Sequence, residues 1–337
     1  MERGRASRVR MEDIAAKAGV SRTAVSFVLN NRADASISEV TRTRIIQVAS
    51  ELGYRPHAGA RALAVQRSGL IGMITEVVTS PFGPEIIRGA QDAAWSDGKF
   101  LLIAATEGRR ELEESAIEWL LQQRVEGIVY ASASHEEVSL PPALHEQPTV
   151  LVHCFDRDGR LPAVLPDEVV GGYRATRRLL EAGHRRIGLV NLEQDTPAAT
   201  GRLTGYAKAL AEFHLPLDDL LVVHAGATAD DGYESSSELL ELGEPPTALF
   251  CCTDRMAMGA YDAIRERGLK IPTDVAVVGF DNQELIASYL RPRLTTIALP
   301  FAEMGARSLQ LLDALIAGRD VPSRTILDCP LVERSSV

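Results

Sequence analysis

From residue 70 onward the chain alternates between short apolar runs and longer segments with helical periodicity, and this alternation strongly constrains its fold. The apolar runs are 70–74, 100–105, 126–130, 148–152, 187–190, 220–223, 247–251 and 275–279. The segments with helical spacing are 84–97, 109–123, 168–182, 198–212, 230–242 and 253–267. Such βαβ repetition predicts parallel sheets with helices on both faces.

The number of strands indicates two sheets rather than one. A single sheet of ten or more strands is unusual, and a polar, turn-rich segment, 156–166, falls near the middle of the alternation. A last helix is expected at about 301–317, followed by a short apolar segment at Ile326 and Leu327. We therefore predict an α/β body of two parallel-sheet subdomains with a cleft between them.

The N-terminal part has a different pattern, which predicts a small all-α head. Segment 13–30 is typical of two helices joined by a turn, with Gly19 at the corner, where a positive φ is cheap, and Ser21 as the N-cap of the second helix. A third helix is expected to begin at Ser38 and to stop before Gly53.

The second of these helices, 22–30, has one apolar and one polar side. The apolar side consists of Ala24, Val25, Val28 and Leu29, and the other side of Arg22, Thr23, Ser26, Phe27 and Asn30. Guanidinium, hydroxyl and amide groups near a helix N-terminus suit the edges of bases in a DNA major groove. The alternative is an ordinary helical hairpin, which leaves the aromatic ring on the polar side unexplained.

Charge is distributed unevenly along the chain. The net charge is −10, but residues 1–67 contain 12 Lys and Arg against 6 Asp and Glu, so this part is +6 and the remainder −16. A basic head on an acidic body can bind DNA through the head while the body is repelled.

Between the two parts lies segment 54–69, which is alanine-rich and basic and contains Gly59. It is marginal as an isolated helix. It is either a plain linker or a hinge that becomes helical only on DNA, with Arg61 at a phosphate and Leu63 inserted into the minor groove.

Several classes of protein are disfavoured. The four cysteines lack metal-ligand spacing, so we expect them to be buried apolar side chains in a reduced, cytoplasmic protein without a metal site; a redox role is the alternative. No cofactor is expected. No signal-peptide core and no apolar run of about 18 residues occurs, which argues against export and membrane insertion. A phosphate loop, HExxH and G-x-S-x-G are also missing, and His184 is expected to be a turn residue rather than a base, so an enzyme is disfavoured. A solute-binding protein would share the body but not the basic head.

Motifs along nearly the whole chain then carry a resemblance. They are Asp13-Ile14-Ala15, Gly19-Val20-Ser21, Val28-Leu29-Asn30, Leu52-Gly53-Tyr54, Ala60-Arg61-Ala62-Leu63, Gly183-His184-Arg185, Asp254-Arg255-Met256 and Gly279-Phe280-Asp281. In this order they resemble the lactose-repressor (LacI/GalR) family of bacterial transcription regulators.

The resemblance implies a helix-turn-helix head (9–55), a hinge (56–68) and a periplasmic-binding-protein-like body (69–337). Its subdomains would be 69–158 with 298–323, and 162–293 with 324–337. It further implies a homodimer that binds a pseudopalindromic operator, usually as a repressor, under control of a small effector such as a sugar or sugar derivative. The implied DNA contacts are Ser21, Arg22, Thr23, Ser26, Phe27, Asn30, Tyr54, Ala60, Arg61, Leu63 and Ala64. The implied effector contacts are Phe82, Arg202, Thr253 and Asp281.

The residues support the cleft contacts independently of the family. Asp281 follows a predicted strand, at the end where ligands of parallel sheets bind, and a carboxylate and a guanidinium suit paired hydroxyls. The alternative is that Asp281 caps the next helix and that Arg202 forms a surface ion pair.

The chain also departs from the family pattern. Phe27 stands where several members have Arg, so contact with a thymine methyl replaces a guanine contact. Segment 226–230 has no aromatic residue, and His153-Cys154-Phe155 replaces a more polar segment. The last two departures weaken the case that the effector is a common hexose. No leucine heptads follow the body, so a coiled-coil tetramer is not indicated. The sequence identifies neither the effector nor the sign of its effect.

Overall fold

A computed structural model describes residues 9–29, 37–54, 67–76, 83–193 and 196–337. The chain divides into two compact units, 1–69 and 70–337, called here the head and the body. Each unit is described by itself.

The described part of the head contains three helices, α1 (Met11–Ala18), α2 (Arg22–Leu29) and α3 (Glu39–Glu51). Gly19 ends α1 in the left-handed conformation with φ 63°. The hydroxyl of Ser21 accepts from the backbone N–H of Ala24 at 3.1 Å, so the expected N-cap of α2 is confirmed. The hydroxyl of Ser38 accepts from the backbone N–H of Thr41 at 3.3 Å, so Ser38, where the third helix was expected to begin, is the N-cap of α3. Fully buried Ile14, Val25 and Ile45 form the centre of the head core.

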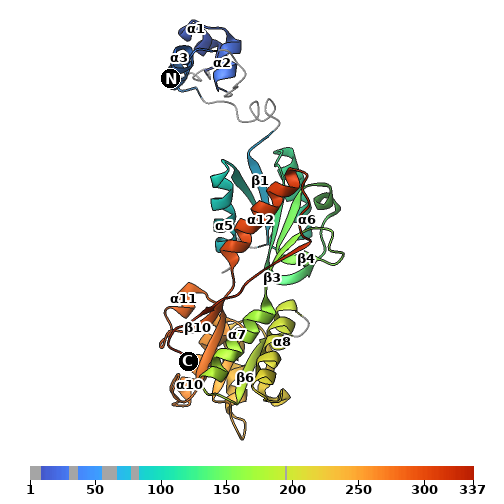
Figure 1. Cartoon of the computed structure of the whole chain (residues 1–337), viewed down its shortest axis with the longest axis vertical. Coiled ribbons are helices and arrows are strands. Elements are labelled where there is room, and N and C mark those ends of the chain that lie inside the picture. Colours follow the sequence, from blue (N-terminus) through green and yellow to red (C-terminus); the bar gives the residue numbers. More distant parts are fainter. Residues whose placement is uncertain (1–8, 30–36, 55–66, 77–82, 194–195) are drawn as a thin grey trace, which may run out of the picture. The chain divides into compact units, whose positions relative to one another are not determined.

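The first subdomain of the body is a six-stranded parallel sheet in the order β11-β5-β4-β3-β1-β2. Its strands are β1 (Leu70–Thr75), β2 (Phe100–Ala105), β3 (Ile128–Val138), β4 (Thr149–Asp156), β5 (Ala163–Pro166) and β11 (Arg324–Leu327). Its helices are α5 (Gly83–Ser96), α6 (Arg110–Gln122), α12 (Phe301–Ile316) and the short 3-10 helix η1 (Pro142–Glu146). Helices α5 and α12 pack side by side (Figure 1).

The second subdomain is also a six-stranded sheet, in the order β12-β10-β9-β8-β6-β7. Its strands are β6 (Ile187–Leu192), β7 (Val222–Ala225), β8 (Ala248–Cys251), β9 (Ala276–Asp281), β10 (Thr295–Ala298) and β12 (Leu331–Val332). Its helices are α7 (Glu168–Glu181), α8 (Pro197–Glu212), α9 (Ala229–Leu240), α10 (Asp254–Glu266), α11 (Glu284–Ala287) and the short 3-10 helix η2 (Asp219–Leu221). All its pairs are parallel except β10 with β12, which is antiparallel.

Strand pairing corrects the expected subdomain limits. We assigned 162–166 and 324–327 to the second subdomain, but β5 and β11 pair with each other in the first sheet. The turn-rich composition of 156–166 hid β5, because a four-residue strand leaves little periodic signal. The chain therefore crosses between subdomains after β5, between β10 and α12, and between β11 and β12 (Figure 1).

Helices α7 and α8 approach closely, and this contact positions the cleft residues. A Cβ on Gly172 would lie 2.4 Å from the carbonyl oxygen of Arg202, and one on Gly205 would lie 2.2 Å from that of Val169. Only glycine permits this approach, which brings the N-terminal turn of α7 against the middle of α8.

Candidate functional site

Helix α2 presents its N-terminal side chains to solvent, as the sequence predicts. Arg22 and Thr23 are exposed, whereas Val25 and Val28 are buried in the head core. Nε of Arg22 lies 3.6 Å from Oε1 of Glu12, but both side chains are more than half exposed, so this pair binds the guanidinium only weakly. The side chains of Arg22 and Thr23 are therefore accessible at the surface of the head.

The middle of α2 is less exposed than the sequence predicts. Ser26 and Phe27 are half-buried, and each makes a further contact, so the ring is not simply a solvent-exposed aromatic. Tyr54 follows α3, donates its backbone N–H to the carbonyl of Ala49 at 2.9 Å and packs against the head core. The other residues predicted for DNA contact, Asn30, Ala60, Arg61, Leu63 and Ala64, lie outside the described residues.

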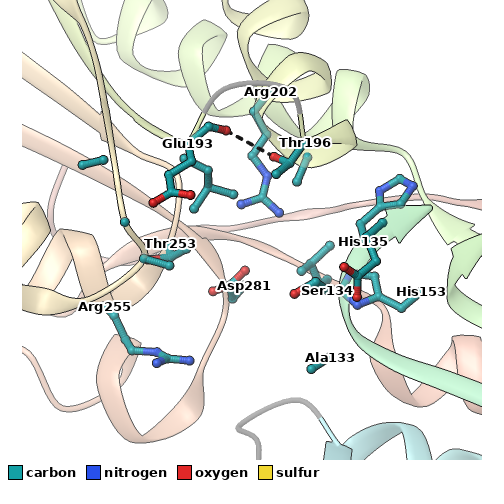
Figure 2. A pocket seen from close by; sticks show the side chains of 17 residues that line it. Ala133, Ser134, His135, His153, Glu193, Thr196, Arg202, Thr253, Arg255 and Asp281 are labelled. Carbon is teal, nitrogen blue, oxygen red and sulfur yellow. Dashed lines mark hydrogen bonds between the residues drawn. The ribbon is translucent and has the colours of Figure 1, made fainter. Parts of the chain in front are cut away.

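The body contains a cavity of about 390 Å³ between its two subdomains (Figure 2). Its walls come from the carboxyl-terminal parts of strands in both sheets, where ligands of parallel sheets bind. The lining residues are 133–136, His153, Leu192, Glu193, Thr196, Ala198, Arg202, 225–227, Thr253, Arg255, Asp281 and Leu299. The structure thus brings together Arg202, Thr253 and Asp281, while Phe82 lies outside the described residues.

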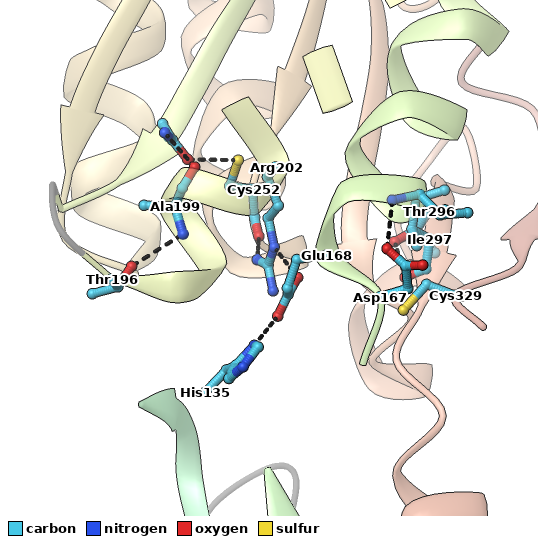
Figure 3. A network of polar contacts seen from close by, with 12 residues as sticks. His135, Asp167, Glu168, Thr196, Ala199, Arg202, Cys252, Thr296, Ile297 and Cys329 are labelled. Carbon is cyan, nitrogen blue, oxygen red and sulfur yellow. Dashed lines mark hydrogen bonds and ion pairs between the residues drawn. The ribbon is translucent and has the colours of Figure 1, made fainter. Parts of the chain in front are cut away.

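Arg202 is buried in the wall, and it makes a buried ion pair rather than a surface one. Its Nε donates to Oε2 of Glu168 at 2.8 Å, and both side chains are at most 4% exposed. Nη1 donates to the carbonyl of Cys252 (Figure 3). The guanidinium lies over the Phe280 ring, 3.8 Å from its centroid. A guanidinium carries five N–H donors, and the two hydrogen bonds with the described residues Glu168 and Cys252 use two of them. Arg202 also lines the cavity.

Glu168 anchors this network and was not singled out from the sequence. Burial by itself opposes ionisation, but the Arg202 charge and the contact with His135 outweigh it and lower the pKa of Glu168 to about 2. A glutamate at the first position of a helix is common for dipole reasons alone, so nothing in the sequence indicated a buried role.

Asp281 ends β9 on the floor of the cleft. It does not cap the next helix, α11, because the N-cap of that helix is Gln283. The Oδ2 atom of Asp281 instead accepts from the side chain of Gln283 at 3.1 Å. Burial raises the pKa of Asp281, and the Arg202 charge offsets this only in part. Its backbone has φ 107°, a strained conformation for a residue other than glycine, and such strain is found mainly at functional sites.

The start of α10 forms the adjoining wall. Thr253 is its N-cap and accepts from the backbone N–H of Met256 at 3.0 Å, so its own hydroxyl proton remains available. Arg255 is half-buried in the lining and has no ion-pair partner among the described residues. Asp254 is buried and is not among the lining residues; it accepts from the hydroxyl of Thr296 and from the backbone N–H of Gln283, each at 2.6 Å.

Two histidines on the first subdomain complete the cleft. His135 on β3 places Nδ1 3.2 Å from Oε1 of Glu168 on α7, so this contact joins the two subdomains (Figure 3). His153 on β4 is 4% exposed and lies beside His135, with ring centroids 5.9 Å apart (Figure 2). The sequence marked His153 only as a departure from the family, and it gave no signal for His135.

The arrangement is suited to binding rather than to covalent chemistry. The thiol nearest the cleft, Cys252, is buried, and burial raises its pKa to about 12, so it is a poor nucleophile. In the described part of the chain no three His, Cys, Asp or Glu side chains are grouped so that they could hold a metal ion. Among the described helices, none is both long enough and apolar enough to cross a bilayer.

An exposed polar recognition helix and a ligand cleft in a separate body define a class, the ligand-controlled DNA-binding regulators. Comparison with known proteins agrees. Residues 10–57 match the model of bacterial regulatory proteins of the lacI family, and residues 176–337 match that of the periplasmic binding protein-like domain. The chain belongs to the lacI family of bacterial regulatory proteins, and it is a transcriptional regulator rather than an enzyme.

Relatives span the whole length of the chain. The ribose operon repressor of Haemophilus influenzae is 33% identical over 97% of this chain and 98% of its own. The transcriptional repressor CytR of Escherichia coli K12 is 33% identical over 97% and 95%. Among solved structures, the lac repressor dimer bound to operator and the anti-inducer ONPF has a TM-score of 0.82, with 27% identity over 98% of this chain and 99% of that one. The regulator CelR in complex with cellobiose has a TM-score of 0.69, with 29% identity over 98% and 100%.

Proposed function

We propose that the protein is a cytoplasmic, nucleoid-associated repressor that binds a pseudopalindromic operator as a homodimer, with an affinity set by a sugar or related metabolite. The observation that carries this proposal is the cavity in which Arg202, Thr253 and Asp281 converge from three elements of the second subdomain. In this proposal the head is 9–55, the hinge 56–68 and the body 69–337.

For the head, the proposed base contacts are Arg22, Thr23 and Phe27, because the first two are exposed at the start of α2. Ser21, Ser26 and Asn30 lie nearer to phosphates in this arrangement. Tyr54, Ala60, Arg61 and Ala64 follow the minor groove, and Leu63 inserts between base pairs. For the residues that lie outside the described part of the chain, this assignment rests on the sequence motifs alone.

Exposed apolar side chains support the homodimer. Strand β2 is an edge of the first sheet and carries apolar side chains that solvent reaches: Phe100 is 55% exposed and Ile103 is 41% exposed. Trp95, at the end of α5, is 62% exposed. Leu285 and Tyr289, at and just after α11, are 84% and 65% exposed. Edges and apolar patches of this kind are normally covered in a stable protein, and a second copy of the chain would cover them.

For the ligand, the cleft offers donors from Arg202, an acceptor from Asp281 and a hydroxyl from Thr253. This set suits the paired hydroxyls of a carbohydrate, and Phe82 would add an apolar surface. Two relatives support the class, since one is named for a ribose operon and another was solved with cellobiose. Neither identifies the ligand of this chain.

The contact between His135 and Glu168 gives a physical route for control. It joins the two subdomains across the cleft, next to Arg202. A ligand in the cleft competes with or reinforces this contact and so changes the angle between the subdomains and the spacing of the two heads.

The proposal is tested by selecting binding sites from random duplex DNA with the full-length protein at physiological salt. A two-fold symmetric consensus with a flexible central step supports a dimer with a minor-groove insertion. If no sequence is enriched, the selection is repeated with metabolite extracts that could supply a corepressor. A second failure to enrich any sequence contradicts the proposal.

A further inference from the structure

The cleft contains a buried polar group that lacks a well-formed hydrogen bond. His153 is 4% exposed, and neither Nδ1 nor Nε2 makes a well-formed hydrogen bond to the residues that the structure describes; the backbone of Ser132 interacts with the ring only weakly. Buried polar atoms are nearly always paired, and leaving both nitrogens of one ring unpaired costs stability. Such a cost is understandable where a ligand supplies the missing partners.

The backbone at His153 is strained as well. Its φ is 60°, in the left-handed region, although it lies inside strand β4. The neighbouring strand β3 has an irregular register between Ala131 and Glu136, next to this position. The rings of His153 and Phe301 meet edge to face with their centroids 5.4 Å apart, and His153 lines the cavity.

The charge state of His153 defines what it can bind. Burial, reinforced by the neighbouring imidazole of His135, lowers the pKa of His153 to about 3. At neutral pH the ring is therefore uncharged and offers one N–H donor and one lone-pair acceptor. A hydroxyl group can both accept and donate, whereas a carboxylate only accepts and an ammonium only donates.

The other charges of the lining agree with an uncharged ligand. Glu168 neutralises Arg202, and Arg255 is the one remaining arginine or lysine among the described lining residues. It faces the carboxyl groups of Glu136 and Glu193, together with Asp281, which is only partly ionised at neutral pH because burial raises its pKa to about 7. This excess of acidic groups disfavours sugar acids and sugar phosphates.

We propose that His153 determines specificity in the cleft by exchanging hydrogen bonds with ligand hydroxyls, and that the ligand is an uncharged polyhydroxy compound. The proposal rests on the ligand site proposed above and adds the wall of the first subdomain to it. His135, which is engaged by Glu168, positions this wall against the second subdomain.

The test is thermal denaturation of the full chain with neutral sugars and their charged analogues as probes. The neutral probes are D-ribose, D-glucose, D-galactose and cellobiose, and the charged ones are D-glucuronate, D-glucosamine and D-glucose 6-phosphate. We expect a neutral probe, and none of the charged ones, to raise the Tm of the wild type. A rise in Tm with a charged analogue would overturn the proposed ligand class. So would the absence of any rise with the four neutral probes.

Two variants separate ligand recognition from a structural role. His153→Phe keeps the ring volume without the nitrogens, so the unliganded variant should melt at the same or a higher temperature while its affinity for the neutral probe falls roughly 10- to 100-fold. His153→Asn retains a donor and an acceptor and should recover part of the affinity. A His153→Phe variant that melts lower and keeps the wild-type ligand shift refutes the role.

His145→Phe is the matched control, because Nδ1 of His145 is also buried and unpaired but lies outside the cleft lining. It should leave the ligand shift unchanged, and loss of the shift in this variant would count against the assignment to His153. Failure of this inference is distinguishable from failure of the proposed function. A protein that selects an operator but responds to no neutral sugar remains a regulator, whereas one that selects no operator is not the proposed repressor.

Discussion

Replacing Glu168 by Gln should lower the free energy of unfolding of the body by about 3 kcal/mol, because the charge of Arg202 would stay buried without its partner. Two arguments give this size. Removing one member of a buried ion pair typically costs about 3–5 kcal/mol. Lowering the pKa of Glu168 from 4.5 to about 2 corresponds to about 3 kcal/mol in favour of the charged form. Gln keeps the shape of the side chain and can still accept a hydrogen bond, so we expect a loss at the lower end of the range of about 3–5 kcal/mol.

The matched control is Glu181→Gln on the same helix. Glu181 also binds an arginine, Arg177, at 2.9 Å, but these two side chains are 49% and 46% exposed. An exposed pair of this kind contributes about 0.3–0.5 kcal/mol. The two variants therefore differ mainly in burial of the ion pair.

Urea denaturation followed by tryptophan fluorescence measures both variants. The signal reports on the body alone, because both tryptophans of the chain, Trp95 and Trp119, lie there. A loss for Glu168→Gln no larger than that for Glu181→Gln would refute the reasoning.

The same pair predicts a pH dependence with a defined sign. The pKa of Glu168 is lower in the folded than in the unfolded state, so its contribution is fully present above pH 4.5 and is lost as the pH falls toward 2. The difference in stability between the wild type and Glu168→Gln should accordingly shrink over this range. A difference that stays constant between pH 6 and pH 3 would contradict the assigned cause.

Three further predictions concern DNA binding and assembly. Arg22→Ala should cost about 1–3 kcal/mol at one base pair of the operator, as measured by competition with singly substituted duplexes; a uniform loss would make Arg22 a phosphate contact. Leu63→Ala should weaken operator binding and leave the thermal shift by ligand intact, whereas unchanged operator affinity would refute the insertion. Phe100→Asp should dissociate the dimer in sedimentation experiments, while Leu220→Asp, at a residue that is 70% exposed against 55% for Phe100 but away from β2, should not. A Phe100→Asp variant that remains dimeric would exclude this edge from the interface.

Features with a local physical cause could be predicted from the sequence. Three such features depend on neighbours within a few residues: the glycine at the corner of the head, the cap at Ser21 with the start of the third helix at Ser38, and the alternation of strands and helices. The long parallel strands were found because both of their faces are buried and apolar. Strands β5, β10 and β12 were missed, because these short segments lie outside the apolar runs that mark the other strands.

Only the cleft residues of the second subdomain could be predicted from the sequence. Asp281 was found because it follows a strand, and Arg202 because of the family motif. Glu168 and His135 were not found, because their roles depend on a contact that closes only when two subdomains meet. The unpaired ring of His153 is likewise a property of the packed structure and not of its neighbours in sequence.

The central claim is that occupancy of the cleft controls operator affinity, and the most direct measurement is the Kd of the full-length protein for its selected operator with and without a saturating sugar that stabilises the body. The account predicts a change of roughly 5- to 150-fold, in either direction. Asp281→Asn should keep the unliganded Kd and lose the response. An operator Kd that does not move while the sugar is bound would contradict the claim.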